Sequence, residues 1–171
     1  MQENPLWAYS LKVYDKPGVQ PLLLQLQDNF GADINLLLGC CWLAADNRAV
    51  TDDDLSALIK VSAKWRAECL MPLRAVRRFL KTQQQAESIY QRAKMLELDA
   101  ERWQQDQMYQ WLSVLKTPLS ELPDKEQLAL YNLQQYCARL PGVDWAAVAP
   151  LVSELVVLLG MNPTPGPPTD Q

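Results

Sequence analysis

Apolar residues recur at helical spacing along most of the chain, and this pattern predicts an all-α protein. From Val19 to Phe30 the apolar positions follow the i, i+3, i+4, i+7 spacing of one helix face. From Ile34 to Ala45 the residues are apolar nearly all round, which is typical of a helix at the centre of a core. No stretch is convincing as a strand. We therefore predict a single-domain bundle of six to eight helices, with the helix over residues 34–45 at its centre.

Capping residues divide the pattern into separate helices. Asn4 suits the start of a first helix, and Gly31 suits the end of a second. Thr51 and Asp54 have the spacing of a capping box and open a fourth helix, which Pro72 breaks or kinks. Further helices are expected at about residues 74–85, 86–115, 124–140 and 144–159. The helix near 86–115 is long, roughly 45 Å at 1.5 Å per residue, and its Trp103 and Trp111 are expected in the core.

The ends of the chain and the lengths of its apolar runs bear on the number of domains and on where in the cell the protein is expected. We expect residues 1–160 to form an all-helical domain and the proline-rich residues 161–171 to form a disordered tail. The N-terminus lacks the basic start and apolar core of a signal peptide. The longest uncharged apolar run, from Leu36 to Ala45, is half the length of a membrane span. We therefore expect a cytoplasmic protein without membrane insertion.

The composition excludes several kinds of chemistry. The sequence has no histidine, which removes the commonest general base and metal ligand. Cys40, Cys41, Cys69 and Cys137 show no CxxC spacing, so we expect reduced thiols and neither a zinc site nor a disulfide framework. No P-loop or nucleophile elbow is present. We therefore expect no metal and no cofactor.

Charge is unevenly distributed along the chain. The net charge of −4 argues against a nucleic-acid partner. Between Lys60 and Lys81, however, there are seven basic residues and one acidic residue, Glu68. Such a segment can be a contact surface, or acidic neighbours can satisfy it within the fold.

Two sets of charged residues at helical spacing form one candidate site. One set is basic and shares a face of its helix: Arg74, Arg77, Arg78 and Lys81. The other set is Glu97 and Glu101, which are four residues apart on the long helix. If the two helices pack antiparallel, the sets can form interhelical ion pairs. The alternative is an anionic ligand or partner bound by the arginines.

Polar residues between two apolar runs form a second candidate site. Asp28 lies in the last turn of its helix, where its charge opposes the helix dipole and needs compensation. Asp33 is placed to cap the next helix, and Asn35 lies in the first turn of that helix. We predict that Asp28 and Asn35 are buried and that Asp28 pairs with Arg74 or Arg77. The alternative to this structural clasp is a ligand site.

Four segments carry a resemblance: LWAYSLKVYDKPGV, LQLQDNFGADINLLLGCCWLA, PLRAVRRFLK and LELDAERW. They resemble a family of short, uncharacterised proteobacterial proteins filed as a domain of unknown function, with LQDxxGxDxNLLL as the most specific block. The resemblance covers about residues 6–103 and implies an all-helical cytoplasmic protein with no established activity. Genes of that family often neighbour one for an ABC-type ATPase, which suggests such an ATPase as a partner. The family's polar positions fall on Asp28, Asp33, Asn35, Arg74, Arg77, Glu97 and Glu101.

The sequence leaves two functions open, and it does not decide whether the protein is an enzyme. The first is a non-enzymatic interaction or regulatory protein, favoured by the missing catalytic motifs and the uneven charge. The second is a helical enzyme or ligand-binding protein that holds an anionic or phosphorylated small molecule in a buried cluster of arginine, glutamate and aspartate. A closed, fully paired cluster would favour the first function, and an open cavity would favour the second.

Overall fold

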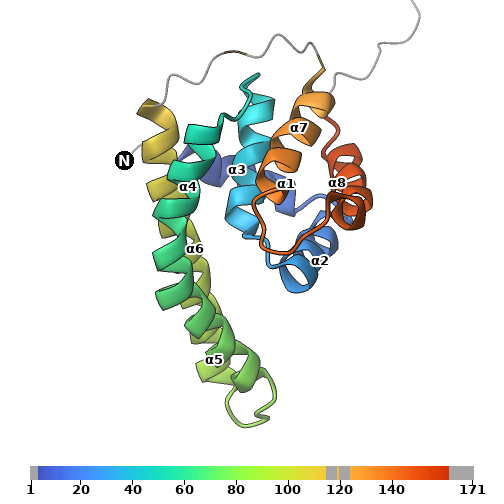
Figure 1. Ribbon diagram of the computed structural model, residues 1–171. Coiled ribbons are helices and arrows are strands. Elements are labelled where there is room, and N and C mark those ends of the chain that lie inside the picture. Colours follow the sequence, from blue (N-terminus) through green and yellow to red (C-terminus); the bar gives the residue numbers. More distant parts are fainter. Residues whose placement is uncertain (1–3, 115–118, 120–123, 162–171) are drawn as a thin grey trace, which may run out of the picture. The chain divides into compact units, whose positions relative to one another are not determined.

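The computed structural model describes residues 4–114, 119 and 124–161 of the 171-residue chain. Within these residues the chain forms eight α-helices and a π-helical segment, with no strand beyond an isolated bridge between Arg48 and Leu119 (Figure 1). The predicted all-α fold is confirmed. The elements are α1 (Pro5–Tyr14), α2 (Val19–Phe30), α3 (Ile34–Ala45), α4 (Asp52–Trp65), η1 (Arg66–Leu70), α5 (Met71–Lys81), α6 (Glu87–Val114), α7 (Lys125–Cys137) and α8 (Trp145–Leu159).

The helices gather into two compact units. Unit 1 comprises residues 1–11 and 51–116, and unit 2 comprises residues 12–50 and 117–171. The helix α1 contributes residues to both. That residues 1–160 form one domain stays a prediction, and the predicted tail lies outside the described residues from 162 onward.

Unit 2 is built around α3, as the sequence predicted. Leu37 and Leu43 are fully buried, and α3 packs against α2 and α7. The helix α8 completes this core by packing on α2 and α7. A helix with no polar face must be enclosed by others, and α3 meets that requirement.

The connection from α2 to α3 also forms as predicted. Gly31 ends α2 in the left-handed conformation, with φ of 71°, and its N–H donates to the carbonyl of Gln27. The side chain of Asp33 caps α3 by accepting a hydrogen bond from the N–H of Asn35 at 2.9 Å. Local capping chemistry therefore accounts for this turn.

Buried thiols are part of the unit 2 core. Cys40, Cys41 and Cys137 are buried there, Cys69 is half-buried in unit 1, and all four thiols are free. Burial raises the pKa of Cys41 to about 12 and that of Cys137 to about 11, and it raises the pKa of Cys40 as well. These three thiols are therefore protonated at neutral pH.

Unit 1 contains α4, η1, α5 and α6, and α5 runs antiparallel to α6 (Figure 1). The predicted capping box of Thr51 and Asp54 opens α4. The long helix predicted near 86–115 is α6. The helix predicted at 74–85 is α5, which begins earlier, at Met71, and ends at Lys81. None of the described helices is both long and apolar enough to cross a membrane.

Candidate functional site

Ion pairs join α5 to α6 at the centre of a hairpin, which we define as α5 together with α6 as far as Trp103. Arg74 Nε lies 3.3 Å from Glu97 Oε1, and Arg74 Nη2 lies 2.9 Å from Glu101 Oε1. Arg77 Nε also donates to Glu97, and this hydrogen bond raises the pKa of the Arg77 guanidinium. Arg74 and Glu97 are both buried. The four residues thus form a closed network of interhelical ion pairs.

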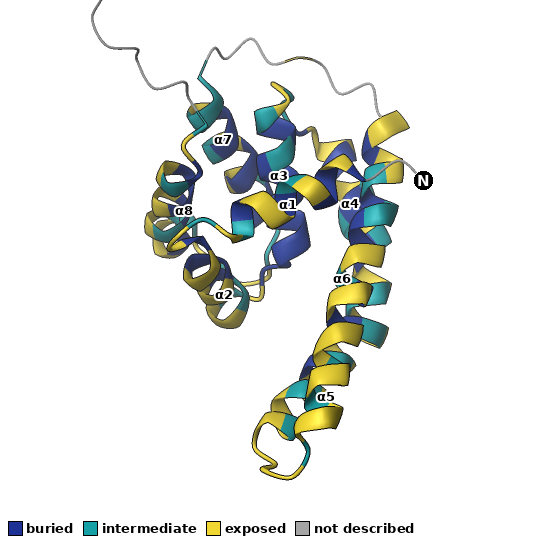
Figure 2. Cartoon of the chain, turned by 180° about the vertical axis from the view of Figure 1, so that it is seen from behind, coloured by how far each residue is buried: buried dark blue, intermediate teal, exposed yellow. Residues whose placement is uncertain are grey.

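The inward-facing charges leave the apolar residues of α5 on the outside. Phe79 is 65% exposed and Val76 is 50% exposed, and Met71 and Ala75 are also exposed. Figure 2 colours most residues of α5 and of the neighbouring part of α6 as exposed. A surface helix usually turns its apolar stripe inward, so the α5–α6 hairpin has the reverse arrangement.

The π-helical segment η1 explains this reversal. The buried line of α4 runs through Leu55, Leu58 and Ser62. Continued at 3.6 residues per turn, that line would pass through Leu73, Val76 and Leu80. Because η1 holds one residue more per turn than an α-helix, the residues after it lag by about 100°. This rotation turns Val76 outward, leaves Leu73 and Leu80 half-buried beside it, and brings Arg74 and Arg77 toward α6.

Pro72 supplies a cause for the π-helical segment. Proline has no N–H to donate to the carbonyl of Glu68, and its ring clashes with that carbonyl in a regular α-helix. Widening the preceding turn relieves the clash, and the N–H of Met71 accordingly bonds to the carbonyl of Arg66, five residues back. The break or kink predicted at Pro72 is thus a widened turn in a continuous helical rod.

On α6 a second apolar line faces outward. Ile89, Leu96 and Trp103 are spaced seven residues apart, and each is between 44% and 54% exposed. Because α5 and α6 are antiparallel and share the ion-pair seam, this line lies on the same side of the seam as the outward line of α5. We call these residues together the apolar face: Leu73, Val76, Leu80, Ile89, Leu96 and Trp103.

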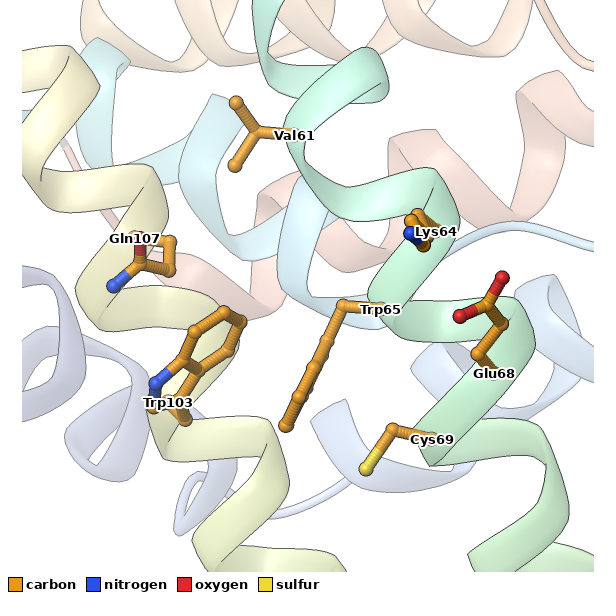
Figure 3. A pocket seen from close by; sticks show the side chains of 7 residues that line it. All are labelled: Val61, Lys64, Trp65, Glu68, Cys69, Trp103 and Gln107. Atoms are coloured by element: carbon orange, nitrogen blue, oxygen red, sulfur yellow. The ribbon is translucent and has the colours of Figure 1, made fainter.

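A hollow of about 410 Å³ adjoins the apolar face at Trp103. Its lining comes from α4, η1 and α6 and also includes Trp65, Cys69 and Gln107 (Figure 3). The two indole rings lie with their centroids 4.0 Å apart, and Trp65 Nε1 donates to the carbonyl of Ala100 at 3.0 Å. The expectation that Trp103 and Trp111 are core residues is wrong, because both remain over 40% exposed.

One positive and one negative side chain of α6 border the apolar face. On α6, Arg92 follows Ile89 by three residues and Asp99 follows Leu96 by three, so each lies beside the apolar line. Both side chains are exposed. The border on α6 therefore offers one positive and one negative charge.

The second candidate site does not form as predicted. Asn35 is buried, as expected, but Asp28 is exposed, so the predicted buried ion pair of Asp28 is wrong. Gln27 Nε2 donates to Asp28 Oδ1 at 3.3 Å, while Arg74 and Arg77 are engaged by Glu97 and Glu101. Asp28, Asp33 and Asn35 belong to unit 2, and the four ion-pair residues belong to unit 1. At the end of a helix in water, solvent screens the unfavourable dipole, so no buried arginine is needed.

Two buried polar side chains of α7 were missed by the sequence reasoning. Asn132 accepts from the N–H of Val50 at 2.8 Å and donates to the carbonyls of Cys40 and Arg48, which fastens the turn after α3 to α7. The Tyr136 hydroxyl accepts from the N–H of Asp33 at 2.8 Å. Their partners lie over eighty residues away along the chain, so no local pattern could have indicated them.

The described residues include no cluster of three or more side chains of the metal-binding types His, Cys, Asp and Glu. The chemistry that unit 1 offers is therefore an apolar surface with a paired charge network behind it. Neither the comparison with curated proteins nor the comparison with solved structures gave a match. The model of one family, described as "Protein of unknown function (DUF2390)", matches residues 5–108, which span all of α1 to α5 and most of α6. The chain belongs to this family of unknown function.

Proposed function

We propose that this protein is a non-enzymatic interaction protein whose docking surface is the apolar face of the α5–α6 hairpin. The observation that carries the proposal is the reversed arrangement of this hairpin, with paired charges inside and large apolar side chains outside. Exposing such side chains to water is unfavourable. A protein partner that covers them would remove that cost.

The closed ion-pair network supports this function over a ligand site. Glu97 and Glu101 already occupy the positions that an anionic ligand would take on Arg74 and Arg77. A phosphorylated small molecule would have to displace both carboxylates and would itself meet their negative charge. The network therefore fits a structural role in holding α5 to α6.

The free thiols support a location for this function. Four cysteines without a disulfide are typical of a reducing compartment. We include a cytoplasmic location in the proposal for that reason.

Affinity capture with a matched surface variant tests the proposed function. The full chain and its Val76→Asp/Leu96→Asp variant would be used as baits in a lysate of the source organism, after circular dichroism shows that both are helical. We expect a reproducible protein that binds the wild-type bait and is lost with the variant, and that rebinds in purified form. The ABC-type ATPase suggested by the resemblance is one candidate to purify. A co-purifying metabolite that is retained by the variant and released by Arg77→Ala would overturn the proposal.

A further inference from the structure

We propose that the apolar face is covered by a second copy of this chain, in an antiparallel two-fold dimer that turns two hairpins into a four-helix bundle. This inference rests on the proposed function, because it names the partner of the same surface. It follows from three features of the hairpin, which are the spacing of its apolar residues, the order of its charges and the level at which α5 meets α6.

The apolar line of α6 is symmetric about Leu96. Ile89 lies seven residues before Leu96, and Trp103 lies seven residues after it. When two copies of α6 pack antiparallel with the two-fold axis at Leu96, Leu96 meets its own equivalent. Ile89 of each copy then lies against Trp103 of the other, at the edge of the hollow beside Trp65. An isologous interface requires such self-complementarity.

The charges bordering this line are complementary under the same symmetry. Arg92 lies four residues before Leu96, and Asp99 lies three residues after it. In the antiparallel pair, Arg92 of one copy therefore lies opposite Asp99 of the other, and this contact occurs twice. Within one helix the two residues are seven positions apart, about 10.5 Å along the axis, so they do not pair with each other.

The apolar line of α5 follows the same symmetry axis. The ion pairs of Glu97 with Arg74 and Arg77 place residues 74–77 of α5 at the level of Glu97 on α6. The axis through Leu96 thus passes near Val76, which meets its own equivalent. Leu73 and Leu80 lie three residues before and four residues after Val76, so they meet each other across the axis. Both helices therefore present palindromic apolar lines with one common centre.

This symmetry favours a second copy over other occupants. An anionic membrane surface would meet Asp99 with like charge, and a strongly acidic helix would do the same. A strongly basic helix would meet Arg92 with like charge. Only a partner with the opposite order of charges satisfies both residues, and an antiparallel copy of α6 has that order.

Measurement of the molar mass by light scattering or sedimentation equilibrium tests the dimer. The full chain should have the mass of two 19.4 kDa chains and dissociate on dilution. Leu96→Glu should yield monomers, because it places two carboxylates against each other on the axis. The matched control is Leu98→Glu, because Leu98 is 49% exposed and lies on α6 about 160° around the helix from Leu96. This control should remain dimeric, and circular dichroism should show that both variants are helical.

Charge reversal then tests the antiparallel register. Arg92→Asp alone should weaken the dimer, since the new carboxylate would face the carboxylate of Asp99 at both contacts. Asp99→Arg alone should also weaken it, because two guanidinium groups would then face each other at both contacts. We expect each change to weaken dimerisation by about tenfold. An equimolar mixture of the two single variants should form a mixed dimer that dissociates at concentrations close to the wild-type value. Native mass spectrometry distinguishes the mixed dimer from either homodimer when one variant is isotopically labelled.

Three outcomes would overturn the inference. One is a wild-type chain that stays monomeric at every concentration. A monomeric chain that binds phosphatidylserine vesicles through Leu96 would count as this outcome. Another is a dimer that persists in Leu96→Glu. The third is a mixture of charge variants that gains no mixed dimer. A monomeric chain that nevertheless captures a different protein through Leu96 would overturn the dimer and leave the proposed function in place.

Discussion

The core around α3 and the hairpin of α5 and α6 place their apolar and charged side chains in opposite ways. In unit 2, Leu37, Leu43 and most other apolar side chains of α3 are buried, and the buried side chain of Asn132 fastens a turn. In the α5–α6 hairpin, a buried network of arginine and glutamate lies inside, and Val76, Phe79 and Leu96 lie outside. Unit 2 exposes large apolar side chains on separate elements, such as Leu24 on α2 and Val157 on α8, whereas the hairpin exposes several of them together outside a paired charge network.

The difference shows what each region is suited for. Burial of apolar area is the main stabilising contribution to folding, so the α3 core is built for stability. A buried ion-pair network contributes less net stability than well-packed apolar residues of similar volume. The hairpin thus gives up stability and gains an apolar surface that another molecule can cover.

Breaking the ion-pair network should have the largest effect. Glu97→Ala leaves two arginines without their shared carboxylate and should cost about 3–5 kcal/mol of unfolding free energy. Chemical denaturation measures it, and Glu87→Ala, at an exposed site in the first turn of α6, is the control with a cost of less than about 0.5 kcal/mol. Replacing Arg74, Arg77 and Glu97 together by leucine should recover most of the loss. A cost below about 1 kcal/mol for Glu97→Ala would show that the network does not hold the hairpin.

Apolar truncation should separate the two regions. Leu43→Ala in α3 removes a fully buried side chain and should cost about 2–5 kcal/mol. Phe79→Ala removes a larger side chain that is 65% exposed and should change the unfolding free energy by less than about 0.5 kcal/mol. The same denaturation experiment compares both. A large cost for Phe79→Ala would mean that this side chain is packed, and the contrast between the regions would be lost.

Alkaline pH should destabilise the core through its thiols. The pKa of Cys137 is raised from 9.0 to about 11 in the folded protein, so the unfolded state loses its thiol proton first as the pH rises above 9. Stability is fully present below pH 9 and falls by about 1.4 kcal/mol per pH unit for such a thiol, until the folded thiol ionises near pH 11. The unfolding free energy, measured at pH 8, 9, 10 and 11, should fall more steeply with pH for the wild type than for Cys137→Ala. Equal pH dependence in both proteins would contradict the prediction.

The smallest effect should come from Asp28. Its side chain is exposed at the end of α2, so Asp28→Ala should change the unfolding free energy by less than about 0.5 kcal/mol. The direction should be a slight gain, because a negative charge at a helix C-terminus is unfavourable. Thermal melts would detect a larger change. A loss of more than about 1 kcal/mol would mean that the contacts of the Asp28 side chain stabilise the fold, and the prediction would be wrong.

Short-range chemistry was readable from the sequence. Gly31, Asp33 and Thr51 act within a few residues of their own positions, and each caps its helix as predicted. The ion pairs were also accessible, because the two arginines share one helix face, the two glutamates share another, and antiparallel packing lets these faces pair. In these cases the spacing along the chain carries the information that the structure uses.

The sequence did not predict the contacts between distant residues or the direction in which the side chains of α5 face. Asn132 meets the carbonyl of Cys40 across 92 positions, which no pattern in either helix encodes. Asp28 was predicted to be buried with an arginine because its charge opposes the dipole of α2, but its side chain is exposed at the end of the helix, where solvent screens that charge. The outward turn of Val76 depends on η1, whose one-residue shift follows from Pro72 and is invisible to a strict helical period. One signal could have indicated this outward turn. The apolar line that continues from α4 and the basic line of Arg74 and Arg77 beside it cannot both face inward.

Because residues 66–70 form a widened turn, this segment can be one residue shorter and still connect α4 to α5. A regular α-helix would cover the same rise and rotation with about one residue fewer. A chain lacking one residue here, with alanine in place of Pro72, would still direct Arg74 and Arg77 at Glu97. The same deletion between Leu55 and Ser62 would rotate everything after it by about 100° and separate the charges. The π-helical segment is thus a place where the chain can lose one residue without changing which side chains face α6.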